Sequence, residues 1–143
     1  MKVYELGAET HEITPEDAAH ALAYGMMAVQ PGLDMLAVTA GDDAAALTAA
    51  LQDGAEPFAA LAACGTLPIA AACGAIIAAR LAHVPVVTDG AGATAAVALL
   101  RAINPSAADH CRDAYDILAK KARLTTGVAG ALSVPFVKSL LKV

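Results

Sequence analysis

The sequence predicts an α/β fold in which a small parallel sheet is covered by alanine-rich helices, a Rossmann-like three-layer arrangement. Short apolar runs of β-favouring residues alternate with longer alanine-rich runs, as in parallel sheets. The run VPVVT at 84–88 is so uniformly apolar that we expect it to be covered on both faces. The chain has 143 residues and 58% hydrophobic content, so residues 1–143 are expected to form a single domain around one core.

The first helix has the clearest start in the chain. Thr14 is placed to cap it and Pro15 suits its first position, while the acidic Glu16 and Asp17 follow in the positive first turn. The apolar spacing continues to about residue 29, and we expect the helix to end there.

Two strands and a second helix complete the expected first half. A short strand is expected at 3–6, and a buried strand at 35–39. Asp42 and Asp43 are expected to open the next helix, because acidic residues suit a first turn, and Gly54 ends it.

The second half alternates between helices and one strand. We expect helices over 56–63, 67–82, 93–103 and 106–122, with the strand at 84–88 between the second and third of them. Residues 127–142 close the chain, with Pro135 as a kink or a break. About three strands are visible in all, which is few for a stable open sheet. Self-association is therefore expected, with a homodimer as its simplest form.

Composition excludes several classes of partner. The net charge is -5 and the nine basic residues form no basic stripe, so no nucleic-acid surface is predicted. Cys64, Cys73 and Cys111 are odd in number and lack CxxC spacing, so neither a disulfide framework nor a metal site is predicted. The sequence indicates no cofactor, and the free thiols favour a reducing, cytoplasmic location.

One stretch could be mistaken for a membrane span. Residues 57–79 contain no charged residue across 23 positions, long enough to cross a bilayer. The stretch is mostly alanine, and Gly65 and Pro68 divide it into the two helices expected above. The first residues, MKVYELGAET, lack the apolar region of a signal peptide. We therefore expect no membrane association.

Polar residues at element ends are the candidate functional groups. Asp89 and Gly90 follow the strand at 84–88, at the sheet edge where ligands of open α/β folds bind. Asp89 either orients a ligand or is simply one of the residues that commonly form a turn before glycine. Asp42 and Asp43 are either a ribose or metal site or simply residues that suit a helix dipole.

The histidines do not suggest a catalytic or metal site. His110 and Cys111 are neighbours on an expected helix, where side chains point about 100° apart, so no catalytic dyad is predicted. His11, His20 and His83 are spread without the spacing of metal ligands.

A long stretch of the chain resembles a known enzyme family. IAAACGAIIAARLAHVPVVTDGAGATAAVALLRAINPSAADHC, residues 69–111, resembles one region of the nicotinate-nucleotide:dimethylbenzimidazole phosphoribosyltransferases. The segments VYELGAETHEIT, LDMLAVTAGDDAAALTAAL and ARLTTGVAGALSVPF resemble other parts of that family in the same order. The chain is well under half the usual length, so we expect a shortened, divergent member with segments missing after Gln52 and after Asp113.

The resemblance implies a fold and a reaction. The family fold is a parallel α/β sheet in a dimer. In the family reaction, which makes the lower ligand of cobalamin, dimethylbenzimidazole attacks the ribose of nicotinate mononucleotide and releases nicotinate. Such chemistry needs a base, donors that hold a phosphate and a dry slot for a flat aromatic ring.

Three family positions differ in this chain. Thr126 stands where the family has its catalytic glutamate, and a hydroxyl cannot act as the base at neutral pH. The family's phosphate-binding turn, Gly-Ile-Gly-Asn-Thr-Thr, corresponds to residues 39–44, where Asp42 and Asp43 would repel a phosphate. Pro68 replaces a further family glutamate.

The resemblance also implies which residues bind the substrate. Carried onto this sequence, they are Thr39, Gly41, Asp42, Asp89, Gly90, Thr94 and Gly127. Thr126 occupies the catalytic position, but Thr125 and Thr126 also suit a helix cap before Gly127.

These observations support three hypotheses for function. The first is a shortened family member that binds a flat heterocycle or a nucleotide, with catalysis weak or lost. The second is a non-catalytic interaction protein that pairs through its alanine-rich faces. The third is an enzyme of altered chemistry that uses Asp42, Asp43 or Asp89.

Overall fold

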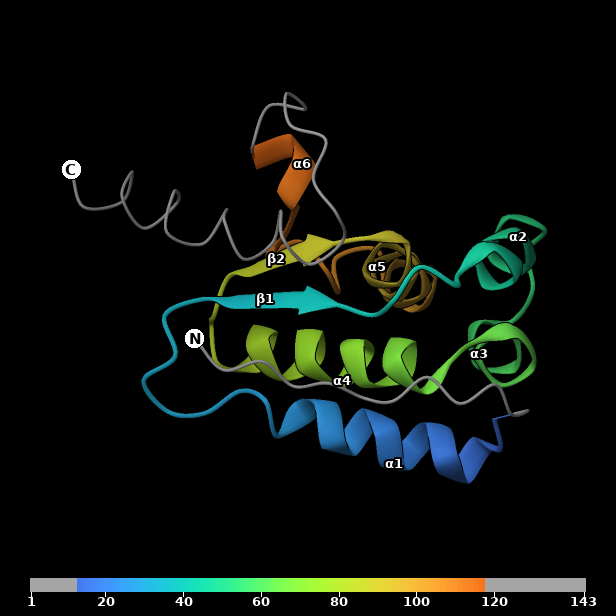
Figure 1. Ribbon diagram of the computed structural model, residues 1–143, viewed down its shortest axis with the longest axis horizontal. Coiled ribbons are helices and arrows are strands. Elements are labelled where there is room, and N and C mark those ends of the chain that lie inside the picture. Colours follow the sequence, from blue (N-terminus) through green and yellow to red (C-terminus); the bar gives the residue numbers. More distant parts are fainter. Residues whose placement is uncertain (1–12, 118–143) are drawn as a thin grey trace.

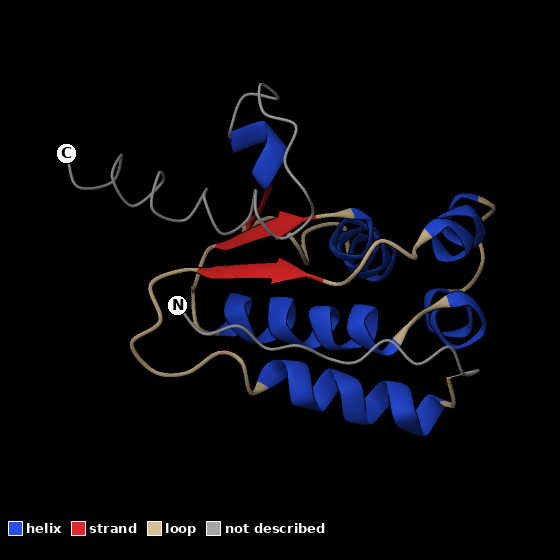
Figure 2. Cartoon of the chain, in the orientation of Figure 1, coloured by secondary structure: helices blue, strands red, loops and turns tan. Residues whose placement is uncertain are grey.

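The computed structural model describes residues 13–117, which form a three-stranded sheet and six helices (Figures 1 and 2). In chain order the elements are α1 (Pro15–Met26), β1 (Leu36–Thr39), α2 (Ala45–Gln52), α3 (Pro57–Cys64), α4 (Leu67–Leu81), β2 (Val86–Asp89), α5 (Ala91–Ile103), β3 (Cys111–Asp113) and α6 (Ala114–Ile117). The predicted α/β class is confirmed. The strand expected at 3–6 lies outside the described residues.

The sheet is parallel throughout, in the order β1-β2-β3. Thr39 at the end of β1 pairs with Asp89 at the end of β2, and Thr88 pairs with Asp113 at the end of β3. All three strands therefore end at one edge of the sheet. Helix α4 covers one face, with α1 beyond it, and α6 lies on the opposite face (Figure 1). This arrangement confirms the small three-layer sheet that the sequence predicts.

The strands bury both of their faces against different partners. Val86 belongs to the main core, together with residues of α4 and α5, whereas its neighbour Val87 packs with Met35 and Ala114 on the other face. Every residue of β2 is buried, which confirms the prediction for 86–88, whereas Pro85 in the same run is exposed. The alternation of side chains along β2 decides which polar residue faces which layer at its end.

Helices α1 and α4 approach each other closely at two glycines. A Cβ at Gly25 would lie 1.8 Å from the carbonyl oxygen of Ala71, and one at Gly74 would lie 1.9 Å from that of Leu22. The helix backbones are therefore in direct contact here. The alanine-rich composition of α4 also favours close packing, because small side chains let neighbouring elements approach this helix.

The start of α1 matches the sequence prediction in detail. The Thr14 hydroxyl accepts a hydrogen bond from the Asp17 amide at 3.1 Å, and the Asp17 carboxylate accepts one from the Thr14 amide at 3.3 Å. This reciprocal pair is a capping box. The hydrogen bonds from Thr14 hold the pKa of Asp17 below its usual value. The helix ends at Met26, earlier than expected.

The uncharged stretch at 57–79 forms two helices, as predicted. Helix α3 ends at Cys64, and α4 begins at Leu67 after a cap by the Thr66 hydroxyl. Within residues 13–117, no helix has both the length and the apolar character that crossing a membrane would require.

The helix predicted over 106–122 is wrong in its first half. Residues 105–110 form turns, and residues 111–113 form β3. The Val86 amide donates to the His110 carbonyl oxygen at 3.1 Å, and Cys111 pairs with Val86. Pairing with a buried strand thus overrides the local helical preference, which a reading of local pattern cannot anticipate.

Smaller corrections concern the ends of elements. Helix α2 begins at Ala45 rather than at Asp42, and the residue that caps it, Ala44, makes no side-chain capping bond. Helix α5 begins at Ala91, two residues before the predicted start. Strand β2 occupies 86–89 rather than 84–88.

Candidate ligand site at the carboxyl edge of the sheet

Each strand of the sheet ends on a polar residue. Thr39, Asp89 and Asp113 end β1, β2 and β3. Paired residues of parallel strands point to the same face, so Thr39 and Asp89 lie side by side on the face that Val87 also uses. Asp89 is 1% exposed, whereas Thr39 is exposed. A buried carboxylate thus lies beside an accessible hydroxyl at the edge where open α/β folds bind ligands.

A close backbone contact joins the loop after β1 to the start of α5. The Gly92 amide donates to the Gly41 carbonyl oxygen at 2.9 Å. A Cβ at Gly92 would lie 2.0 Å from the Ala40 carbonyl oxygen, so only glycine fits this contact. Gly41 and Gly90 have φ values of 70° and 91°, in the left-handed region that glycine favours. The structure therefore brings Thr39, Gly41, Asp89 and Gly90, four of the predicted binding positions, to one edge of the sheet.

The N-terminus of α5 has no capping side chain. Gly90 is the capping residue and has no side chain to offer. The Thr94 hydroxyl donates to the Gly90 carbonyl oxygen at 3.1 Å. Helix α5 has 13 residues, so its positive end adds a favourable field for a polar or anionic group at this edge.

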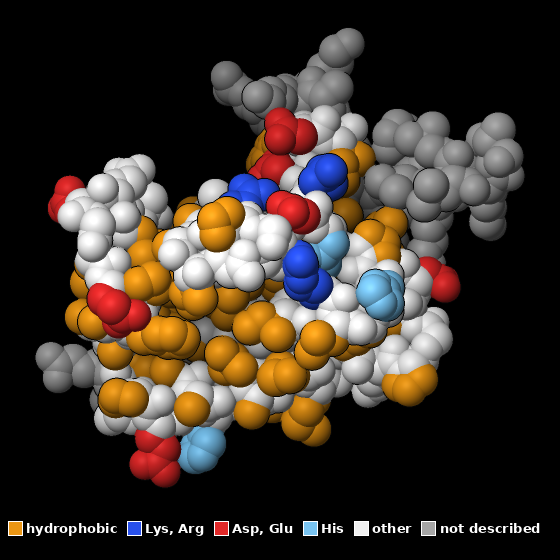
Figure 3. All heavy atoms as spheres, turned by 180° about the vertical axis from the view of Figure 1, so that it is seen from behind, with side chains coloured by type: hydrophobic (Ala, Val, Ile, Leu, Met, Phe, Trp, Pro, Cys, Tyr) orange, Lys and Arg blue, Asp and Glu red, His pale blue; other side chains and the backbone are white. Residues whose placement is uncertain are grey.

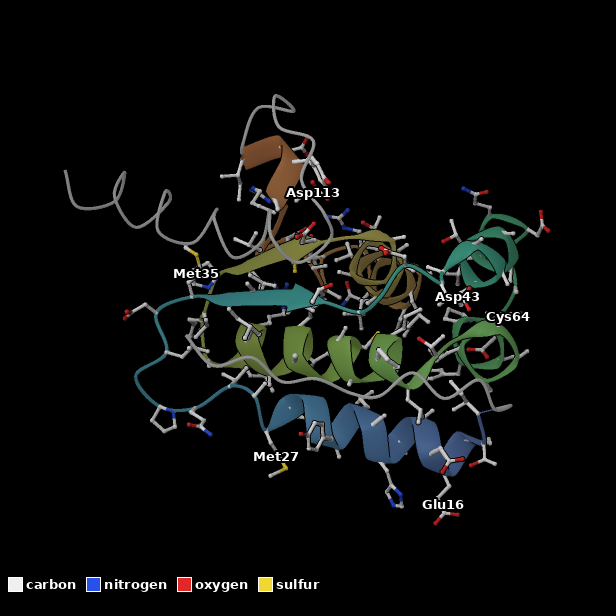
Figure 4. The ribbon with its side chains drawn as sticks, viewed as in Figure 1. Glu16, Met27, Met35, Asp43, Cys64 and Asp113 are labelled. Atoms are coloured by element: carbon white, nitrogen blue, oxygen red, sulfur yellow. The ribbon has the colours of Figure 1, made fainter. Side chains whose placement is uncertain are left out.

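Asp42 and Asp43 lie beside this edge but do not cap α2. Both side chains are exposed, and the helix begins after them, at Ala45. Asp43 extends from the loop beside α2, far from Asp113 at the start of α6 (Figure 4). Residues 13–117 contain no group of three His, Cys, Asp or Glu side chains that could hold a metal ion.

His110 and Cys111 do not lie on the helix that the sequence predicts, because His110 ends a turn and Cys111 begins β3. The Cys111 Sγ lies 4.0 Å from the His110 Nε2, within reach of a weak contact. Burial raises the pKa of Cys111 to about 11 and lowers that of His110. The Nε2 is also 3.0 Å from the Ile76 carbonyl oxygen, to which it donates. Both groups are therefore neutral at pH 7, and the thiol is not an activated nucleophile.

Burial of His110 predicts a pH-dependent stability. Its pKa is lowered in the folded state from the usual 6.5, so the unfolded chain binds the proton more readily. Neutral His110 therefore makes its full contribution to the stability of the folded state above pH 6.5. This contribution is lost as the pH falls from 6.5 through the folded pKa of His110. Chemical denaturation at a series of pH values should show the free energy of unfolding falling over this range.

The His110→Gln variant should show a shallower fall below pH 6.5, because glutamine does not titrate. His83 is exposed, and its replacement by glutamine is the matched control that should keep the wild-type slope. Equal slopes in all three proteins would contradict this role for His110.

A separate cavity lies where helix α5, the ends of β2 and β3 and helix α6 meet. It has a volume of about 240 Å³ and is lined by Thr88, Thr94, Val97, Arg101, Cys111, Arg112, Asp113 and Asp116. Of the predicted site residues within 13–117, Thr94 alone lines it. Sequence reasoning missed Arg112, Asp113 and Asp116 because it placed 106–122 in a helix. The spacing of Thr94, Val97 and Arg101 along one face of α5 was the available signal.

Two predicted positions, Thr126 and Gly127, lie outside the described residues.

A family model described as "Phosphoribosyltransferase" matches residues 39–121. The nicotinate-nucleotide--dimethylbenzimidazole phosphoribosyltransferase of Allorhizobium ampelinum is 54% identical over 56 residues, which are 39% of this chain and 16% of that protein. The protein of the same name from Rhizobium rhizogenes is 52% identical over 56 residues, 39% of this chain and 17% of that protein. The matched segment is thus about a sixth of the length of these curated relatives.

Solved structures share the fold. The crystal structure of CobT from Thermus thermophilus superposes with a TM-score of 0.72 and 22% identity, covering 89% of this chain and 56% of that one. A second crystal structure from the same organism, of a nicotinate-nucleotide-dimethylbenzimidazole phosphoribosyltransferase, gives a TM-score of 0.71 and 24% identity, over 89% and 55% of the two chains. The chain therefore spans little more than half the length of these relatives.

Proposed function

Because the chain belongs to the nicotinate-nucleotide:dimethylbenzimidazole phosphoribosyltransferase family, we propose that it binds a flat heterocycle or a nucleotide at the carboxyl edge of its sheet. The observation that carries this proposal is the register of β1 and β2, which sets the buried Asp89 beside Thr39. The backbone hydrogen bond from Gly92 to Gly41 joins the loop after β1 to the start of α5, next to that pair.

The chemistry of this edge suits such a ligand. A carboxylate accepts hydrogen bonds from a ring N–H or from a ribose hydroxyl. Asp89 ends a fully buried strand, so its position is set by the sheet rather than by a loose loop. The exposed Thr39 hydroxyl can donate or accept beside it.

We propose further that catalysis is weak or lost. The relatives are named for the transfer of a phosphoribosyl group from nicotinate nucleotide to dimethylbenzimidazole. Thr126 stands where the family resemblance implies a catalytic glutamate. A positioned general base contributes roughly a hundred- to ten-thousand-fold in rate, and a hydroxyl does not supply it at neutral pH.

Two measurements on the full chain test binding and turnover separately. Calorimetric titration with dimethylbenzimidazole and with nicotinate mononucleotide should show saturable binding of at least one. Mass spectrometry of a mixture of both with concentrated protein should show no ribazole phosphate above a heat-inactivated control. Absence of any binding would overturn the ligand proposal. Formation of ribazole phosphate would overturn the proposed loss of catalysis and would favour an enzyme that uses another carboxylate as its base.

The Asp89→Asn variant should bind the heterocycle or nucleotide at least about 10-fold more weakly, because a charge-assisted hydrogen bond becomes a neutral one. Titration of the variant measures this change. Asp53→Asn, at an exposed position after α2, is the matched control and should bind as the wild type does. Unchanged binding by Asp89→Asn would place the ligand elsewhere.

A second proposal, self-association, rests on apolar side chains at the surface. Tyr24, Met27, Phe58, Leu81 and Ile103 are between 44% and 72% exposed. Hydrophobic side chains also form a broad band across the face shown in Figure 3. Contiguous apolar surface of this kind marks interaction sites. Sedimentation of the pure protein should show a homodimer, and a monomer at all concentrations would contradict this second proposal.

A further inference from the structure

A cavity of about 680 Å³ lies at the edge of the sheet where the strands begin, opposite the edge around Asp89. Its lining comes from the end of α4 and from the residues just before β2 and β3. Pro85 directly precedes β2, and His110 directly precedes β3. Strand β2 spans four residues at roughly 3.3 Å each, so about 10 Å of strand separates this amino-edge cavity from the candidate ligand site.

Two opposite charges line the amino-edge cavity without pairing to each other. Arg80 comes from the last turn of α4 and Asp109 from the turn before β3, and both are exposed. They lie against the same turn, because the Ser106 carbonyl oxygen accepts from the Arg80 Nη1 and from the Asp109 amide. Within residues 13–117 no ion pair joins the two side chains. The remaining guanidinium donors and the carboxylate are therefore available to a ligand.

His110 adds no charge to this lining. Burial lowers the pKa of His110, its hydrogen bond to the Ile76 carbonyl oxygen raises it, and the charges of Arg80 and Asp109 act on it in opposite directions. The imidazole is therefore neutral at pH 7. Its response to both charges also places Arg80 and Asp109 near one group, so they lie close enough for one small molecule to reach both.

The end of α4 contributes a strained histidine and a favourable field for a cation. The His83 amide donates to the Arg80 carbonyl oxygen and the Val84 amide to that of Ala79, a helix end that usually has glycine at the first of these positions. His83 has a φ of 57° there, and such strain gathers at ligand sites. Because α4 has 15 residues, its negative end favours a positive group in the cavity.

We propose that the amino-edge cavity binds an α-amino acid with an apolar side chain. The ligand carboxylate binds the Arg80 guanidinium, which matches its planar geometry. The ligand ammonium group binds the Asp109 carboxylate and faces the negative end of α4. A simple anion would meet Asp109, and a simple cation would meet Arg80. An α-amino acid carries both charges at pH 7, one bond apart from a shared carbon, as two protein charges on one turn require.

The rest of the lining explains the preference for an apolar side chain. Leu81, Val84 and Pro85 form an apolar wall beside the two charges. The volume of about 680 Å³ lies within the range of roughly 300–1,000 Å³ that is usual for small-molecule sites. A branched or aromatic side chain therefore fits beside the charged groups, and covering the wall removes apolar surface from water.

The test is calorimetric titration of the full chain with L-leucine and with three molecules that each lack one feature of it. Leucinamide lacks the carboxylate, 4-methylpentanoate lacks the ammonium group, and glycine lacks the side chain. Leucine should bind saturably, and each of the other three should bind at least about fivefold more weakly, because each loses a charged pair or the apolar contact.

Three variants test the residues. Arg80→Gln and Asp109→Asn should each weaken leucine binding at least about fivefold. Arg80 also donates to Ser106, so thermal unfolding of each variant is measured alongside. Leu81→Ser changes a side chain that is 72% exposed and should weaken leucine binding while leaving glycine binding unchanged. Arg101→Gln and Asp53→Asn, exposed and outside the cavity, are the matched controls and should bind leucine as the wild type does.

Several results would overturn the proposal. Binding of leucinamide or 4-methylpentanoate as tightly as leucine would show that only one of the two charges acts, and no saturable binding would remove the site altogether. Unchanged leucine affinity in Asp109→Asn or Leu81→Ser, with wild-type thermal stability, would also refute it. Titration with dimethylbenzimidazole separates this result from the proposed function, because heterocycle binding at Asp89 would be the same in all of these variants.

Discussion

Replacing Gly92 with alanine is expected to destabilise the protein by about 2 kcal/mol or more and to abolish ligand binding at the sheet edge. The added Cβ would lie 2.0 Å from the Ala40 carbonyl oxygen and close to that of Gly41. Overpacking of this kind costs typically about 1–3 kcal/mol. Alanine regains at most about 1 kcal/mol of helix propensity, so the clash decides the sign.

Urea denaturation followed by circular dichroism measures the change in stability, and titration with the heterocycle or nucleotide measures the change in binding. Ala91→Ser is the matched control, because it changes the neighbouring but exposed residue of the same helix turn and should leave both properties near the wild type. A stable Gly92→Ala protein that still binds ligand would show that the contact between the two loops is not needed.

Ile76→Ala is expected to cost about 2–5 kcal/mol, the range for removing a large aliphatic side chain from a packed core. Ile76 is 0% exposed at the centre of the main core on α4. Its backbone carbonyl, which accepts from His110, remains in the variant. The measured loss therefore reports the side chain rather than that hydrogen bond.

The next residue on the helix provides the control. Ile77 is partly buried and packs at the margin of the same core, so Ile77→Ala should lose clearly less stability in the same denaturation experiment. Equal losses would mean that α4 does not bury one face more deeply than the other.

The candidate site was predictable where it depends on strand ends. Asp89 and Gly90 were identified because a uniformly apolar strand stops there, and a parallel sheet gathers such ends at one edge. Thr39 was implied only by the family resemblance. Their pairing in register could not be predicted, because the sequence does not state which residues of two distant strands lie opposite each other.

The cavity residues show what local reasoning misses. Arg112 and Asp113 lie in a segment with helical propensity, yet they belong to β3. The pairing of Cys111 with the buried Val86 decides this, and strand preference depends on such contacts more than on the residues themselves. The pairing of β3 with β2 is what brings Arg112 and Asp113 into the lining of the cavity.

The sequence by itself determined the α/β class, the start of α1 at its capping box, the division of 57–79 into two helices and the buried central strand. Each of these depends on neighbours within a few residues, through caps, prolines and apolar spacing. The tertiary structure decided the third strand, the register that joins Thr39 to Asp89, and the glycine contacts that need two backbones to touch. These features arise from residues far apart in the chain, whose contacts are set by packing rather than by local preference.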